Sequence, residues 1–334
     1  MSEKHSEDKM NESHSTYKFV KFGIKGIDDL FRPVKGEVEY GIPRGSSVVL
    51  SGDMGTGKTT FLMQFLKQGI KEGEKGILVS LEESPYNIMR DYCHWEFDGG
   101  TLIDVLRNGR LTVFDGTSLV QEVPLSKQTE RVIEQYYPQY KNNAQKITKE
   151  ILKKWEKNME PDLGGVFHIT EAHESQGIPE MITNTLRKMT ALAEESDKVI
   201  SEKKDFRVCV DSLTSLLSHG IGEASERDPP TTERQLRKTI IELRAILEVS
   251  NATTLFTAEA RPAESTESEF TTTWKNIEHF VARGVIQLGY HGYGKGDLVR
   301  YLRIIKMRGV GHSTTKYAFE ITNKEIEWIG ELIL

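Results

Sequence analysis

Residues 52–59 read Gly-Asp-Met-Gly-Thr-Gly-Lys-Thr, and this stretch decides the fold. It follows the pattern G-x-x-x-x-G-K-[ST], in which a glycine-rich turn joins a strand to a helix. Residues 47–51 before it are apolar and β-branched, as in a buried strand, and residues 61–66 after it open an amphipathic helix. A chance match is expected in about one chain in a hundred of this length. The correct flanks make chance rarer still.

The turn has the features of an anion site. Its glycines let the backbone curl so that several N–H groups face one point, and the helix N-terminus adds partial positive charge there. Lys58 is expected to reach the β- and γ-phosphates of a nucleotide, and Thr59 to bind Mg²⁺ through its hydroxyl. We therefore predict binding of a nucleoside triphosphate. The predicted contacts are Gly52, Asp53, Met54, Gly55, Thr56, Gly57, Lys58, Thr59 and Thr60.

Composition narrows the class of protein. The 334 residues suffice for one large α/β domain or two small ones. There are 44 Lys and Arg against 50 Asp and Glu, a net charge of −6, which argues against a surface that coats nucleic acid along its whole length. Cys93 and Cys209 lie too far apart for a metal motif and indicate a reducing cytosol. No apolar run approaches the length of a membrane span, and the polar N-terminus is no secretory signal.

Apolar runs recur along the chain with helical patterns between them. This alternation predicts an α/β fold whose mostly parallel, twisted sheet carries helices on both faces. Residues 1–16 have almost no apolar content and are expected to form a disordered tail. The core is assigned to residues 17–116 and 201–334. Strands are expected at 76–81, 111–115, 206–211 and 253–257, a helix at 232–249, and a terminal hairpin at 284–288 and 300–306.

Residues 117–200 do not fit a minimal domain of this kind. They are rich in Lys, Glu and Gln and contain no convincing run of strands. Ile147, Ile151 and Trp155 recur at four-residue spacing, which predicts an amphipathic helix in a mainly helical insertion. Two interpretations stay open, a solvated insertion packed on the edge of the domain and a lid that binds a protein partner.

Asp211 ends an apolar strand far downstream of the glycine-rich turn. A carboxylate at the end of such a strand can hold the Mg²⁺ shell through water while Thr59 binds the metal directly. The alternative is an ordinary strand-ending aspartate that caps the next turn. With the phosphate loop upstream, we favour the magnesium role.

Glu82 and Glu83 follow the strand that comes directly after the phosphate-loop helix. If that strand lies beside the phosphate-loop strand, its end falls close to the nucleotide. A carboxylate there can polarise the water that attacks the γ-phosphate. Two adjacent acids can also form a solvated loop, but sites of α/β proteins lie at the carboxyl ends of their strands, which favours catalysis.

These residues, with further motifs, resemble the KaiC-type branch of the RecA/RadA superfamily of ATPases in a single-domain form. The resemblance implies a RecA-like P-loop core, ATP as the nucleotide, and hydrolysis by the Glu82–Glu83 pair. Outside the insertion it extends over about residues 22–328 of the chain. Six motifs in the same order carry it, at residues 23–30, 41–45, 82–83, 210–214, 280–285 and 306–312.

The family's K-x-R-x-x-x-H segment corresponds to Lys306, Arg308 and His312. The resemblance implies that it reaches the nucleotide of a neighbouring subunit, with Arg308 as an arginine finger in trans. Such a finger requires an oligomer, and the family forms rings, usually of six. The alternative is a basic edge strand that presents Lys306 and Arg308 on one face by its two-residue period.

The chain also departs from the family. The family includes a clock protein that has two such domains and phosphorylates itself on a Ser-Thr pair. That pair aligns with His279 and Phe280 of this chain, so autokinase activity is not expected. The family pattern lacks the long insertion after Asp115, and whatever is specific to this protein is expected there.

Three functions compete. The first is an oligomeric regulatory or DNA-repair-associated ATPase. The second is a recombinase-like ATPase that binds single-stranded DNA through loops after Asp211 and Glu259, but Arg227 and Arg261 are too few for a strong electrostatic footprint. The third is a nucleotide-dependent scaffold with little hydrolysis, against which the intact glutamate pair argues.

Overall fold

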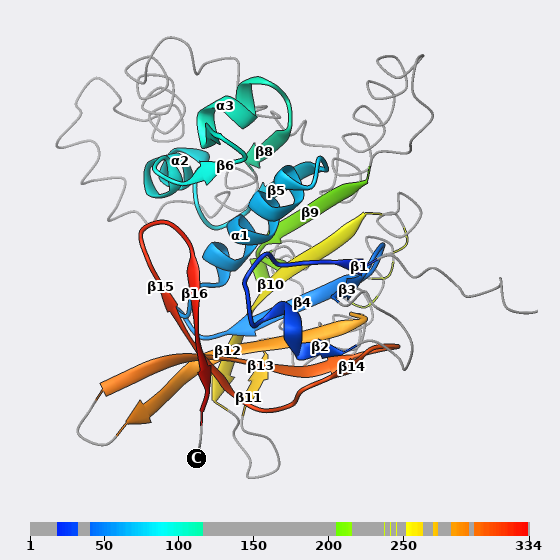
Figure 1. The fold of residues 1–334 in the computed structure, drawn as a ribbon, viewed down its shortest axis with the longest axis vertical. Helices are drawn as coiled ribbons and strands as arrows, with labels where there is room; N and C mark the ends of the chain where they lie inside the picture. Colours follow the sequence, from blue (N-terminus) through cyan, green and yellow to red (C-terminus); the bar gives the residue numbers. More distant parts are fainter. Residues whose placement is uncertain are drawn as a thin grey trace, which may run out of the picture.

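The computed structural model describes residues 19–32, 41–115, 205–215, 252–262, 270–272, 282–293 and 297–332, with single positions at 237, 241 and 245. Within these residues the centre of the molecule is a sheet of ten strands (Figure 1). The predicted tail at 1–16, the insertion at 117–200 and nearly all of the predicted helix at 232–249 lie outside the described residues.

Six neighbouring strands of the sheet run parallel. In spatial order they are β12 (Gly284–Tyr293), β4 (Ser47–Gly52), β10 (Thr253–Pro262), β9 (Phe206–Asp211), β5 (Lys75–Ser80) and β8 (Leu111–Asp115). Antiparallel strands extend the sheet beyond β12, namely β13 (Asp297–Met307), β15 (Tyr317–Ile321) and β16 (Ile326–Glu331), and β11 (Phe270–Thr272) pairs with β10. This arrangement confirms the predicted α/β class with a mostly parallel sheet and antiparallel C-terminal strands.

Short elements complete the described fold. The helices are α1 (Lys58–Lys71), α2 (Pro85–Tyr92) and α3 (Leu102–Arg107), with a 3₁₀ turn, η1, at Asp28–Leu30. Three strand pairs lie outside the main sheet: β1 (Phe19–Val20) with β3 (Ile42–Pro43), β2 (Phe31–Arg32) with β14 (Gly311–His312), and β6 (Glu96–Phe97) with β7 (Gly100–Thr101). In the described part of the chain, no helix is long and apolar enough to cross a membrane.

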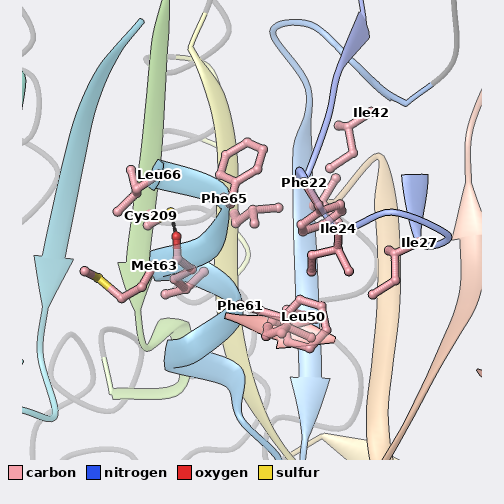
Figure 2. Packing of buried hydrophobic residues seen from close by; sticks show 14 of the residues in the cluster. Phe22, Ile24, Ile27, Ile42, Leu50, Phe61, Met63, Phe65, Leu66 and Cys209 are labelled. Carbon is pink, nitrogen blue, oxygen red and sulfur yellow. Dashed lines mark hydrogen bonds between the residues drawn. The ribbon is translucent and has the colours of Figure 1, made fainter. Parts of the chain in front are cut away.

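Helix α1 is enclosed by the sheet on one side and by the N-terminal segment on another. Nine of its fourteen residues are buried, which explains why its sequence is apolar on more than one face. Figure 2 shows Phe61 and Phe65 of α1 against Phe22, whose ring centroid lies 6.2 Å and 5.6 Å from theirs. This packing fixes the start of α1, and therefore the glycine-rich turn, against the end of β4.

The predicted terminal hairpin is neither terminal nor at the edge of the sheet. Strand β13 pairs with β12 on one side and with β15 on the other, and β16 follows β15. The extra hairpin forms because it has apolar partners: Phe319 packs on Phe61 with ring centroids 5.1 Å apart, and Trp328 stacks on Tyr317. Strand β13 as a whole is therefore not an edge strand, although its pairing with β15 covers only residues 300–302.

Candidate nucleotide-binding site

The turn between β4 and α1 depends on two glycines with positive φ. Gly55 has φ 76° and Gly57 has φ 99°, in the region that residues with a Cβ rarely adopt. At Gly57 a Cβ would also lie 2.4 Å from the Ile321 Cδ1 atom of β15. The Tyr290 hydroxyl donates to the Gly55 carbonyl oxygen at 2.6 Å, so β12 supports the outside of the turn.

Lys58 lies over the inside of the same turn. Its ammonium donates to the carbonyl oxygens of Gly52 and Asp53 at 2.9 and 3.0 Å. The Thr56 hydroxyl donates to the Asp53 carbonyl oxygen at 2.8 Å and tightens the curve. Asp53 is exposed, and the Met54 side chain is 83% exposed. The turn therefore holds one positive charge at its concave side and faces solvent at its tip.

Asp211 receives hydrogen bonds from two threonines of other elements. Thr59 at the start of α1 donates to its Oδ2 atom at 2.7 Å, and Thr257 of β10 donates to its Oδ1 atom at 2.5 Å. Burial raises the pKa of the Asp211 carboxyl, and the two hydroxyl donors oppose that rise. A hydroxyl and a carboxylate that meet beside a phosphate loop are the oxygen donors that Mg²⁺ takes in such sites, so these residues fit that metal.

Glu82 and Glu83 lie at this edge of the sheet, but the strand before them has other neighbours than expected. Strand β5 does not lie beside β4, because β10 and β9 come between them. Glu82 instead meets the end of β9, where the hydroxyls of Ser212 and Ser215 donate to its Oε1 atom. Glu83 is half-buried, and burial, followed by the nearby charge of Asp211, raises the pKa of its carboxyl.

Lys306, Arg308 and His312 lie away from the turn of their own chain. Met307 pairs with Gly284, and Gly284 pairs with Val48 near the start of β4, whereas the glycine-rich turn follows the end of that strand. Lys306 donates to the Ala282 carbonyl oxygen at 2.9 Å. Arg308 is exposed and follows the end of β13, so the two-residue period of a strand does not relate the two side chains.

Backbone contacts fix the segment that carries Arg308. The Arg308 N–H donates to the Arg283 carbonyl oxygen at 3.0 Å, and the Arg283 side chain donates through Nε to the Arg308 carbonyl oxygen at 3.2 Å. His312 lies in β14, with Nδ1 3.1 Å from the Val310 carbonyl oxygen. This segment is therefore a fixed turn with an exposed guanidinium.

Several residues around the site were not predicted from the sequence. Thr257, Ser212 and Ser215 contact the predicted carboxylates, and the Tyr92 hydroxyl lies 3.1 Å from the Thr60 hydroxyl. Thr257 follows the apolar pair Leu255 and Phe256 near the predicted end of its strand, and this hydroxyl is a signal that points to the site. Tyr92 has no such signal, because only the packing of α2 brings it to α1.

Comparisons with known proteins identify the family. The family model described as "ATPase: KaiC" matches residues 20–159 and 152–332. A protein of Thermotoga maritima named "UPF0273 protein" is 26% identical over 309 residues, which are 92% of this chain and 95% of that protein. The "Circadian clock oscillator protein KaiC" of Parathermosynechococcus lividus is 27% identical over 305 residues, 91% of this chain but 41% of that protein.

A solved structure agrees with these matches. The crystal structure of a KaiC-like protein from Pyrococcus horikoshii has a TM-score of 0.53 and 26% sequence identity to this chain, and the match covers 94% of this chain and 99% of that one. The matches to the Thermotoga and Pyrococcus proteins span nearly the whole of both chains, so they are not limited to the phosphate loop. The chain belongs to the KaiC family of ATPases, as a single KaiC-like domain.

Proposed function

We propose that the chain binds ATP with Mg²⁺ at the glycine-rich turn and hydrolyses it. The observation that carries this proposal is the convergence of four functional groups at the carboxyl edge of the sheet. Lys58 and Thr59 follow β4, Asp211 ends β9, and Glu82 follows β5. Ligands of open α/β sheets bind at this edge.

Each group has a distinct role in phosphoryl transfer. The Lys58 ammonium neutralises charge on the β- and γ-phosphates. The Thr59 hydroxyl would hold Mg²⁺ directly, and Asp211 would hold it through water. Glu82 and Glu83 orient and polarise the attacking water. The metal supplies neutralisation of charge on the phosphate oxygens, while these residues place the nucleotide and the water in line.

We further propose that a second copy of the chain completes the site. The strand register supports this, because Arg308 lies beyond the start of β4 and the phosphate loop lies beyond its end. Gly52 lies four residue steps along the strand from Val48, which amounts to roughly 13 Å. Arg308 therefore cannot stabilise the phosphates of its own chain, and Lys306 and His312 accompany it. A closed ring, with six copies as the family resemblance implies, would supply one such segment to each site.

We propose that the biological role of the chain is that of an oligomeric regulatory or DNA-repair-associated ATPase. Of the two loops that a recombinase-like protein would use for DNA, the structure describes only residues 212–215 and 259–262. Arg227 and the 117–200 insertion, which is proposed to bind a protein partner, lie outside the described residues. Turnover measured with and without single-stranded DNA distinguishes the regulatory or repair-associated ATPase from the recombinase-like one, since single-stranded DNA should stimulate a recombinase-like ATPase. A scaffold would retain ATP without appreciable turnover.

Phosphate release by the wild-type chain and by Lys58→Ala tests the proposal. The wild-type chain should release phosphate from ATP only with Mg²⁺. Lys58→Ala should lose charge-assisted contacts worth on the order of 2–4 kcal/mol of ATP binding. Lys71→Ala, which removes a lysine from the far end of the same helix, is the matched control and should keep both affinity and turnover. Unchanged ATP affinity in Lys58→Ala would reject the site.

A further inference from the structure

Two serine hydroxyls hold one oxygen of Glu82. The Ser215 hydroxyl donates to the Glu82 Oε1 atom at 2.9 Å, and the Ser212 hydroxyl donates to the same atom. Both serines come from the chain directly after β9, while Glu82 follows β5. The contact therefore joins residues that are 130 and 133 positions apart in the sequence.

The protons of this cluster can be assigned. A hydroxyl has one proton to donate, so both serines bond Glu82 only if neither donates to the other. The Ser215 backbone N–H donates to the Ser212 hydroxyl oxygen at 3.1 Å and satisfies it as an acceptor. The two hydroxyl oxygens, 3.1 Å apart, can then both direct their protons to the Glu82 Oε1 atom. No described residue donates to the Oε2 atom, which leaves that oxygen for water.

The same short segment is tied to the metal side of the site. Ser212 directly follows Asp211, whose carboxylate accepts from Thr59. The Thr214 hydroxyl accepts from the Glu259 backbone N–H at 3.0 Å, which ties the segment to β10. The segment at 212–215, in which residues 213–215 are helical, therefore connects the carboxylate expected to hold the metal shell with the carboxylate expected to orient water.

We propose that Ser212 and Ser215 are positioning residues for ATP hydrolysis, which hold Glu82 so that its free oxygen orients the attacking water. The inference rests on the proposed function and deepens it. The two glutamates also have different surroundings: Glu82 is exposed and accepts hydrogen bonds from two hydroxyls, whereas Glu83 is half-buried beside Asp211.

Loss of a hydroxyl should affect turnover and not ATP binding. A glutamate has several rotatable bonds, so removing a donor lets the carboxylate leave the position that orients water. Neither serine belongs to the turn at 52–60, so the contacts that hold the phosphates stay in place. We expect Ser215→Ala to lower kcat roughly ten-fold, with KM for ATP unchanged within about two-fold.

The experiment measures kcat and KM for ATP in the full chain. Ser215 is the better first target, because it is part-exposed while Ser212 is fully buried. Ser215→Thr keeps the hydroxyl and should restore most of kcat. Ser84→Ala is the matched control: it removes a serine hydroxyl two positions after Glu82, one that caps α2 through the Asn87 N–H and makes no bond to Glu82. It should keep wild-type kcat.

The outcomes separate this inference from the proposed function. No phosphate release by the wild-type chain rejects hydrolysis, and with it the role of the serines. Wild-type turnover that is retained in Ser215→Ala, and in Ser212→Ala as the second variant, rejects the positioning role alone. A loss of kcat in Ser215→Ala that Ser215→Thr does not restore also rejects it, because the hydroxyl would then not be the group that matters.

Discussion

The Thr59 hydroxyl donates a hydrogen bond of 2.7 Å to Asp211, although 152 positions separate the two residues in the sequence. The other oxygen of the same carboxylate accepts from Thr257. Asp211 is 2% exposed, so these bonds replace most of its contact with water. One carboxylate therefore connects the start of α1, the end of β9 and the strand β10 between β9 and β4.

Thr257→Val should weaken the Mg²⁺-dependent step. Valine has nearly the shape of threonine but no hydroxyl, so the Asp211 Oδ1 atom loses its 2.5 Å donor while the packing stays similar. A buried carboxylate that loses a donor is less favourable in its ionised form. We expect a higher Mg²⁺ concentration for half-maximal turnover, measured by titrating Mg²⁺ at saturating ATP.

Thr254→Val is the matched control on the same strand. Thr254 is buried, and its hydroxyl has no hydrogen-bond partner within the described residues. Removing an unpartnered buried hydroxyl should leave the Mg²⁺ titration unchanged and keep or raise the stability. Equal Mg²⁺ titrations for the two variants would show that the Thr257–Asp211 bond does not influence the metal.

The double substitution Glu82→Gln with Glu83→Gln should keep ATP and lose most turnover. A neutral amide does not take a proton and orients water less strongly than a carboxylate. Equilibrium binding of ATP and single-turnover phosphate release, measured on the same preparation, separate the two effects. Wild-type turnover in the double variant would mean that the pair is only a solvated loop.

The wild-type pH profile should reflect the surroundings of Glu83. Burial raises the pKa of this carboxyl, so its active, ionised form is lost on acidification at a higher pH than for a solvated glutamate. Turnover should therefore begin to fall at a higher pH than a solvated glutamate would allow. Measuring kcat at saturating ATP over a range of pH shows where this decrease begins. Full turnover down to the range of a solvated glutamate would contradict this role.

The contribution of Asp28 to the stability of the fold should decrease as the pH rises. Its carboxylate accepts from the Phe22 and Gly23 N–H groups, yet burial raises its pKa to about 6. A group with a raised pKa in the folded state contributes most stability below its unfolded pKa, near 3.8, and loses it as the pH rises through about 6. The shift of about two units corresponds to roughly 3 kcal/mol at most.

Urea unfolding of the wild-type chain and Asp28→Asn at pH 4 and pH 8 tests this effect. The amide does not ionise, so the free energy of unfolding of the wild type relative to Asp28→Asn should fall by roughly 2–3 kcal/mol between the two pH values. Asp29→Asn, an exposed neighbour, is the control and should show little change. A constant difference for Asp28→Asn would contradict the raised pKa.

The elements that local sequence determines were predicted well. The strands predicted at 47–51, 76–81, 111–115 and 206–211 appear as β4, β5, β8 and β9, within one residue at each end. The helix predicted to open at residues 61–66 begins three residues earlier, at Lys58. Strand β10 is longer than the predicted 253–257, and β12 and β13 extend beyond their predicted ends. The extra residues of β10 and β12 include polar ones such as Glu259, Arg261 and His291, whereas β13 gains mostly apolar residues. Pairing with a neighbouring strand extends β10 and β12, and an apolar run does not indicate such pairing.

The order of strands could not be read from the chain. Glu82 follows the strand that comes next after α1, yet β10 and β9 separate that strand from β4. The hydroxyls that contact the predicted carboxylates come from residues 46, 130 and 133 positions away from them. Such contacts depend on which strands become neighbours, and that is set by packing over the whole sheet.

Arg308 allows the most direct test of a hydrolysis site shared between two copies of the chain. Subunits with Arg308→Ala keep the phosphate loop and glutamates, and subunits with Glu82→Gln and Glu83→Gln keep Arg308. Each preparation alone should turn over slowly, while a mixture contains some intact composite sites and should recover turnover, measured as phosphate release against mixing ratio. A fully active monomer under ATP, or a mixture no more active than its parts, would contradict the shared site.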